Sequence, residues 1–130
     1  IERVENNLLS YGNEMTNKDT PYDCGLGNFC NLDLDYEFIG KSALLEQRNV
    51  GFEKDIYKIQ FNLESEDKPA FFDNLPIYKK DIEMGKATSI VWSPKYSKYL
   101  GFLIASKTIV NNLDDYYILN KAKIEISEIH

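Results

Sequence analysis

The sequence contains only one histidine, His130, which is its last residue. A Ser-His-Asp triad, a Cys-His pair and a histidine-rich metal site all need an imidazole that the fold holds in place. The two cysteines, Cys24 and Cys30, are too few for the disulfide framework of a small secreted protein, so we expect both thiols to be reduced. Any chemistry must therefore rest on carboxylates and bound ligands.

Positive charge and long apolar runs are also scarce. The 130 residues carry 15 Lys+Arg against 21 Asp+Glu, a net charge of −6, and no basic cluster offsets this charge locally. A phosphate backbone would be repelled, so we expect no nucleic-acid partner. The longest apolar run, residues 99–105, is far shorter than the roughly 20 residues that a membrane-spanning helix needs. We therefore expect no membrane partner and a cytoplasmic protein.

The hydrophobic pattern of the first 50 residues predicts two helices and a loop. Ile1, Val4 and Leu8 recur at the spacing of one helix face, so residues 1–10 are predicted to be mostly helical. Residues 13–37 show no sustained period and contain many turn formers, which predicts a long ordered loop. Residues 40–48 are rich in good helix formers and predict a second, short helix.

The remaining residues have the patterns of strands. In residues 55–64, apolar and polar side chains alternate with a period of two, which is typical of a half-buried strand. Further short strand signals lie at residues 76–78, 86–92, 99–106, 116–119 and 122–126, and the charged residues 64–69 predict a loop tip. The predicted fold class is therefore α+β, a helix-and-loop segment followed by a small antiparallel β-barrel. We expect two domains, residues 1–50 and 51–130, in a piece of a longer polypeptide, because the sequence begins at Ile1 rather than at methionine.

Two motifs could be mistaken for ligand sites. The carboxylates of residues 33–37 are spaced as in a calcium loop, but Phe38 and Leu44 stand where such a loop needs glycine and glutamate. Gly25 and Gly27 lack the third glycine, the preceding strand and the following lysine of nucleotide-binding loops. We therefore expect a solvated acidic loop, ordinary turn glycines and no metal site.

Glu5 is the most informative polar residue. It lies at the margin of the apolar face of the first predicted helix, so its carboxylate would sit at the edge of a buried surface. The alternative is an exposed helix carboxylate that pairs with Arg3 or with a lysine, and the spacing leaves both possibilities open. For Arg3 itself we expect an amphipathic helix residue whose stem packs while its charge reaches water.

Several short motifs, in order and with compatible spacing, resemble the glycine-cleavage T-protein family of tetrahydrofolate-dependent aminomethyltransferases and their relatives. They are Arg3-Val4-Glu5, residues 8–15 (LLSYGNEM), Thr20-Pro21, Gly25-Leu26-Gly27, residues 38–44 (FIGKSAL), residues 85–89 (GKATS), Ser93-Pro94 and residues 100–104 (LGFLI). Residues 23–30 (DCGLGNFC) are more similar to the dimethylsulfoniopropionate demethylase branch than to the glycine-cleavage branch. The resemblance covers residues 3–106 and matches only the C-terminal part of the family's proteins.

The resemblance implies a cofactor, partners and site residues. The cofactor would be tetrahydrofolate, and Glu5 would accept hydrogen bonds from the 2-amino and N3 groups of its pterin ring. Tyr11 is a second candidate cofactor-binding residue, which would either stack on the ring or belong to the core. The partners would be a small-molecule one-carbon donor and the N-terminal part of the same polypeptide. That part would supply the acidic catalytic residue, so we expect no catalytic residue in this chain.

The implied reaction is transfer of a methyl or aminomethyl-derived carbon to N5 of tetrahydrofolate. One alternative is a non-catalytic folate-binding protein of the kind that assists iron–sulfur assembly. Those relatives carry Lys-Gly-Cys-Tyr-x-Gly-Gln where this chain has residues 38–41 (FIGK). Another alternative is the accessory folate domain of an amine-oxidising flavoenzyme. The length of the parent polypeptide would separate that alternative from the transferase.

Overall fold

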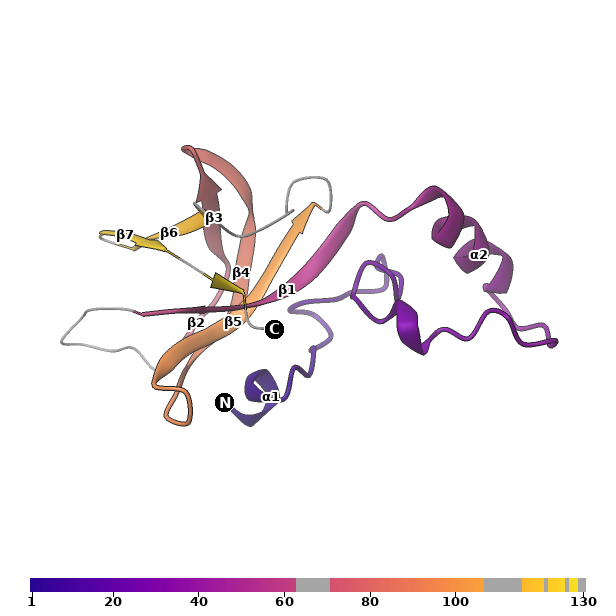
Figure 1. Ribbon diagram of the computed structural model, residues 1–130, viewed down its shortest axis with the longest axis horizontal. Helices are drawn as coiled ribbons and strands as arrows, with labels where there is room; N and C mark the ends of the chain where they lie inside the picture. Colours follow the sequence, from indigo (N-terminus) through magenta and orange to yellow (C-terminus); the bar gives the residue numbers. More distant parts are fainter. Residues whose placement is uncertain (63–70, 107–115, 121, 126, 129–130) are drawn as a thin grey trace.

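A computed structural model describes residues 1–62, 71–106, 116–120, 122–125 and 127–128. The predicted loop tip at residues 64–69 and the terminal His130 lie outside these residues. The first part of the chain contains α1 (Glu2–Glu5), the short 3-10 helix η1 (Gly27–Phe29) and α2 (Lys41–Val50). In Figure 1, α1 lies beside the sheet, whereas α2 lies at the far end of the molecule from most of the strands.

The prediction of a helix over residues 1–10 is wrong, because α1 ends at Glu5. Asn7 adopts the left-handed conformation with φ 58°, and the Leu8 N–H donates to the Arg3 carbonyl at 2.9 Å. Asparagine tolerates this conformation better than most residues, and a backbone bond of this kind closes helix ends. As a result only Val4 of the predicted apolar face is buried, and Leu8 is 59% exposed.

The long loop and the second helix follow the prediction. Within the loop, the side chain of Asp19 accepts hydrogen bonds from the Thr16 N–H and hydroxyl at 2.7 and 3.0 Å. Asp23 does the same for Thr20, at 3.0 and 2.7 Å. These two turns order the chain without regular secondary structure. The helix α2 then ends at Gly51, whose φ of 104° suits glycine.

The strands form one antiparallel sheet that curls around a core (Figure 1). They are β1 (Lys54–Phe61), β2 (Phe71–Phe72), β3 (Leu75–Lys79), β4 (Ile82–Ser93), β5 (Lys98–Ser106), β6 (Tyr116–Asn120), β7 (Ala122–Glu125) and β8 (Ser127–Glu128). Their order is β7-β6-β3-β4-β5-β1-β8, and β2 pairs with β4. Among the described residues no pairing joins β7 to β8, so these strands make a half-barrel.

The predicted fold class is confirmed, and every predicted strand is present. Only β2 and β8 were not predicted, because two residues are too few to show a period of two. The division of the chain into two domains at residue 50 stays a prediction. None of the described helices is long and apolar enough to cross a membrane.

A bulge in β4 shapes the side of the sheet that faces α1. The register between β4 and β5 shifts between Thr88 and Val91, and Ser89 in this stretch has a φ of 52°. Gly101 lies opposite, where a Cβ atom would approach Ile90 Cγ1 to 2.9 Å. The absence of a side chain at Gly101 therefore leaves room for the bulge, which redirects the Ser89 side chain.

Two hydrophobic clusters hold the sheet and α1 together. The larger cluster joins β1, β3, β4, β5 and β6 and contains Ile59, Phe61, Ile77, Ala87, Ile90, Tyr99, Leu103, Ala105, Tyr116 and Ile118. The smaller cluster packs Val4 of α1 against Val91, Leu100 and Phe102 of β4 and β5. Because Val4 is only 2% exposed, it anchors the short helix on the sheet, and this contact places Glu5 beside the end of β4.

Candidate functional site

Glu5 lies at the end of α1 with its carboxylate held by the sheet. Its side chain is partly buried, and its Oε1 accepts a hydrogen bond from the Ser93 hydroxyl at 2.5 Å. Its backbone carbonyl accepts a second bond from Lys58 Nζ of β1 at 2.8 Å. The structure thus places Glu5 at the edge of a buried surface, and no ion pair joins it to Arg3 among the described residues.

The Glu5 carboxylate keeps unused hydrogen-bonding capacity. A carboxylate offers about four acceptor positions on its two oxygens. Within the described part of the chain, Ser93 is the sole side-chain or backbone donor to this carboxylate, and it uses one position on Oε1. Glu5 can therefore accept further hydrogen bonds from a ligand with adjacent N–H donors.

Tyr11, the second predicted cofactor-binding residue, lies on the surface. Its side chain is 68% exposed, and its backbone forms an isolated bridge with Met15. Tyr11 is therefore not a core residue. Its stacking on a ligand ring stays a prediction, as does the ligand role of Glu5.

A second glutamate, Glu14, forms a polar centre that the sequence analysis missed. Its side chain is completely buried, and its two oxygens accept four hydrogen bonds. Oε2 accepts from Arg3 Nη1 at 2.9 Å and from the Ser10 N–H at 2.7 Å. Oε1 accepts from the hydroxyls of Thr88 at 3.0 Å and Ser89 at 2.5 Å. All of its acceptor positions are thus in use, which indicates a structural role.

Arg3 completes this centre, and its side chain stays 33% exposed, so its charge pairs with Glu14 and also reaches solvent, as predicted. Its guanidinium pairs with Glu14 and also donates to the Ser89 hydroxyl at 2.5 Å and the Leu8 carbonyl at 2.7 Å. The guanidinium also lies over the ring of Phe102, 5.8 Å from its centroid. Arg3 supplies the compensating charge that the buried carboxylate of Glu14 needs. The sequence contained only an indirect indication of this polar centre, since Glu14 and Ser89 lie within motifs that carry the family resemblance.

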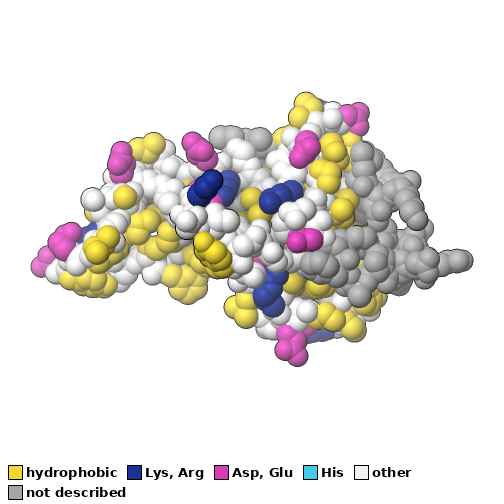
Figure 2. Space-filling view, turned by 180° about the vertical axis from the view of Figure 1, so that it is seen from behind, with side chains coloured by type: hydrophobic (Ala, Val, Ile, Leu, Met, Phe, Trp, Pro, Cys, Tyr) yellow, Lys and Arg dark blue, Asp and Glu magenta, His cyan; other side chains and the backbone are white. Residues whose placement is uncertain are grey.

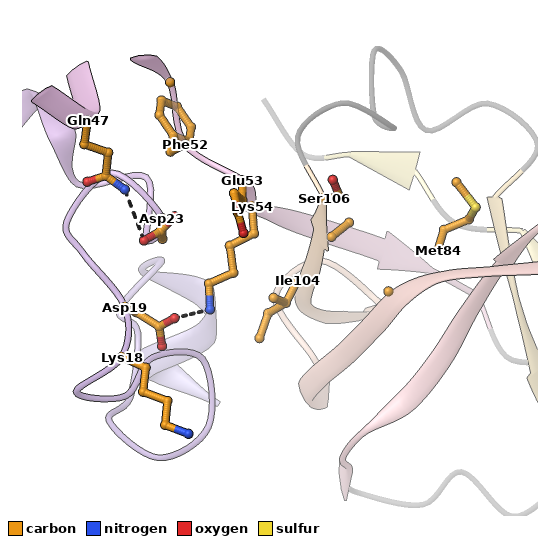
Figure 3. A pocket seen from close by; sticks show the side chains of 13 residues that line it. Lys18, Asp19, Asp23, Gln47, Phe52, Glu53, Lys54, Met84, Ile104 and Ser106 are labelled. Carbon is orange, nitrogen blue, oxygen red and sulfur yellow. Dashed lines mark hydrogen bonds and ion pairs between the residues drawn. The ribbon is translucent and has the colours of Figure 1, made fainter. Parts of the chain in front are cut away.

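The structure also has a cavity of about 720 Å³ between the loop and α2 on one side and the ends of β4 and β5 on the other (Figure 3). It is lined by Lys18, Asp19, Asp23, Gln47, Gly51, Phe52, Glu53, Lys54, Met84, Gly85, Ile104, Ala105 and Ser106. Neither Glu5 nor Tyr11 lines this cavity. The predicted ligand residues and the cavity are therefore separate features.

An ion pair and buried groups set the electrostatics beside this cavity. Lys54 Nζ donates to Asp19 Oδ1, and this hydrogen bond lowers the pKa of Asp19 below its usual value (Figure 3). Gln47 Nε2 donates to Asp23 Oδ2 at 3.4 Å. Burial raises the pKa of the Cys24 thiol, and the nearby carboxylates of Asp19 and Asp23 raise it further. Cys24 is therefore a protonated, unreactive thiol, and both cysteines are free, as predicted.

Exposed hydrophobic side chains gather at the loop and α2 end of the molecule (Figure 2). They are Phe29, Leu34, Tyr36, Phe38, Ile39 and Val50. Phe29 is 85% exposed and Val50 is 82% exposed. Such a concentration of apolar surface is unusual for a protein that functions as an isolated monomer.

Comparison with known proteins identifies relatives of the chain. No family model matches the sequence. The dimethylsulfoniopropionate demethylase DmdA of Ruegeria pomeroyi is 44% identical over 96 residues, which cover 74% of this chain and 25% of the relative. An aminomethyltransferase of Prochlorococcus marinus is 35% identical over 92 residues, which cover 71% of this chain and 24% of the relative. The chain thus spans about a quarter of the length of these curated relatives.

The fold is shared with a solved structure. The glycine cleavage system aminomethyltransferase T of Bartonella henselae matches 98% of this chain and 35% of its own chain, with a TM-score of 0.79. Its sequence identity is 18%, so this match concerns the fold. The sequence relatives agree with the family that the motifs resemble, and the structural match agrees in fold. The chain therefore belongs to the glycine-cleavage T-protein (aminomethyltransferase) family, and it corresponds to the C-terminal part of the family's proteins.

Proposed function

We propose that this chain is the C-terminal part of a tetrahydrofolate-dependent one-carbon transferase of the dimethylsulfoniopropionate demethylase or aminomethyltransferase type. The observation that carries the proposal is the Glu5 carboxylate, which the Ser93 hydroxyl holds while its other acceptor positions remain available. The whole enzyme would act in the cytoplasm on a small one-carbon donor.

The chemistry of Glu5 fits the cofactor. A reduced pterin presents its 2-amino and N3 groups as adjacent N–H donors, and one carboxylate can accept both bonds. Hydrogen bonds to a charged group contribute about 1.5 to 3 kcal/mol each. Bound tetrahydrofolate would supply N5 as the acceptor of the one-carbon unit. In this proposal, Glu5 binds and orients the ring, and the rest of the polypeptide encloses it.

The demethylase type is favoured within this proposal. DmdA is 44% identical to this chain, against 35% for the Prochlorococcus aminomethyltransferase. A sulfonium methyl group is already electrophilic, so the enzyme would need only to hold the donor carbon near N5 and exclude water. No nucleophilic side chain is required for such a transfer.

The proposal is tested by substituting Glu5 in the full-length protein. We expect Glu5→Ala to weaken tetrahydrofolate binding at least about tenfold, because about two charge-assisted bonds are lost. Isothermal titration calorimetry measures the dissociation constant directly. Glu2→Ala is the matched control, since Glu2 lies on the same helix and is exposed. Equal affinity of Glu5→Ala and wild type would contradict the assignment.

A further inference from the structure

We propose that Ser93 is a positioning residue that orients the Glu5 carboxylate for the ligand. The inference rests on the proposed function, because it assigns to Ser93 a role in the folate affinity that Glu5 confers. It concerns a residue that would not touch the cofactor and would act only through its hydrogen bond to Glu5.

The bonding around Ser93 fixes the direction of its hydroxyl proton. Ser93 Oγ accepts a hydrogen bond from the Tyr96 N–H at 3.2 Å. A serine hydroxyl has one proton to donate. Because Glu5 Oε1 lies 2.5 Å away and accepts that proton, the hydroxyl acts as a donor with a defined direction.

Ser93 also lies where its hydroxyl can fix the orientation of the Glu5 carboxylate. It is completely buried, and it is the last residue of β4, paired with Lys98 across the turn to β5. Glu5, in contrast, ends a helix of only four residues. A long side chain such as glutamate loses rotamer freedom when it is fixed, so a donor that fixes it in advance lowers the cost of ligand binding.

The other contacts of Glu5 do not fix its carboxylate. Lys58 holds only the backbone carbonyl, at 2.8 Å, and Val4 anchors the helix through apolar packing. Arg3, on the same helix, is directed to Glu14 and Ser89. Within the described residues, the orientation of the carboxylate therefore depends on the Ser93 hydroxyl.

A double-mutant cycle in the full-length protein tests this role, with tetrahydrofolate as the probe and calorimetry as the readout. We expect Ser93→Ala to weaken tetrahydrofolate binding about fivefold in the wild-type background. In the Glu5→Ala background, the same substitution should leave the affinity unchanged, because there is no carboxylate to orient. A merely structural role would lower the affinity by the same factor in both backgrounds.

Ser89→Ala is the matched control for the loss of a buried β4 hydroxyl. Ser89 is 1% exposed and bonds to Glu14 rather than to Glu5, so the effect of Ser89→Ala on affinity should be the same in both backgrounds. If Ser93→Ala does not fold, Ser93→Cys replaces it in the cycle, since a thiol has a similar shape and is a weaker donor.

The outcomes separate this inference from the proposed function. Unchanged affinity of Ser93→Ala, or an equal loss in both backgrounds, overturns the role of Ser93 while Glu5 remains the ligand residue. Unchanged affinity of Glu5→Ala itself overturns the proposed function, and the role of Ser93 with it. A loss for Ser93→Ala that disappears in the Glu5→Ala background supports both.

Discussion

Glu5 and Glu14 are nine positions apart and have opposite environments. Glu14 is buried and accepts four hydrogen bonds, one of them from the guanidinium of Arg3. Removal of one partner from a buried pair leaves the other charge without compensation, which costs far more than the pair itself contributes. Glu14 should therefore matter for stability, whereas Glu5 should matter for ligand affinity.

We expect Glu14→Ala to lower the free energy of unfolding by about 3 to 5 kcal/mol, because Arg3, Thr88 and Ser89 lose their shared acceptor. Chemical denaturation of the full-length protein gives this quantity. Glu46→Ala, on the exposed surface of α2, is the control and should change stability by less than about 0.5 kcal/mol. A similar stability for the two variants would show that the Glu14 centre is dispensable.

At the scale of elements, the loop that precedes α2 is attached to β1 by one ion pair. Asp19, in the turn that begins at Thr16, accepts a hydrogen bond from Lys54 at the start of β1. The Asp19 side chain is 6% exposed and the Lys54 side chain is 37% exposed, so solvent screens this pair only in part. The pair therefore couples the turn at Thr16 to the sheet.

This ion pair should make stability depend on pH. The hydrogen bond from Lys54 lowers the folded-state pKa of Asp19 below 3.8. A carboxyl group with a lowered pKa stabilises the fold above its unfolded-state pKa, and this contribution disappears as the pH falls through the folded-state value. We expect the melting temperature of wild type to exceed that of Asp19→Asn at pH 7, and the difference to shrink below about pH 4.

The control for this pH dependence is Asp33→Asn. Asp33 is 81% exposed in its side chain and pairs with Arg48 at 3.2 Å. Exposed pairs contribute little, so this substitution should change the melting temperature only slightly at either pH. A difference between wild type and Asp19→Asn that stays constant from pH 7 to pH 3 would rule out the ion pair as its cause.

The elements differ in how well their sequences predicted them. The strands from β1 to β7, apart from β2, follow the predicted segments, because a period of two reports directly on a half-buried sheet. The first helix was predicted too long, because its apolar spacing continues past Asn7, which turns the backbone left-handed. Apolar spacing describes which residues could share a face, and it does not show where a backbone turn interrupts the helix.

At the scale of the whole molecule, the chain resembles a part rather than a complete enzyme. It spans about a quarter of its curated relatives, and its loop and α2 expose large apolar side chains such as Phe29 and Ile39. By the family resemblance, the acidic catalytic residue would lie in the N-terminal part. Activity should thus require that part.

We expect the isolated 130 residues to show no methyl transfer to tetrahydrofolate, because this chain lacks the acidic group that the resemblance assigns elsewhere. A liquid-chromatography assay for 5-methyltetrahydrofolate, with a sulfonium donor, measures the reaction. The full-length protein under the same conditions is the positive control. Measurable turnover by the isolated chain would show that its own residues suffice for catalysis.

The antiparallel strands, the second helix and the family could be predicted from the chain alone, because each depends on local periodicity or on short motifs in order. The contacts of the two glutamates, in contrast, follow only from the three-dimensional fold. The partner of Glu5 lies 88 positions away at Ser93, and Glu14 meets Ser89 across 75 positions. Contacts at such separations leave no periodic trace in the chain. They arise because Val4 packs α1 against β4 and β5, while a bulge in β4 turns Ser89 toward the same segment.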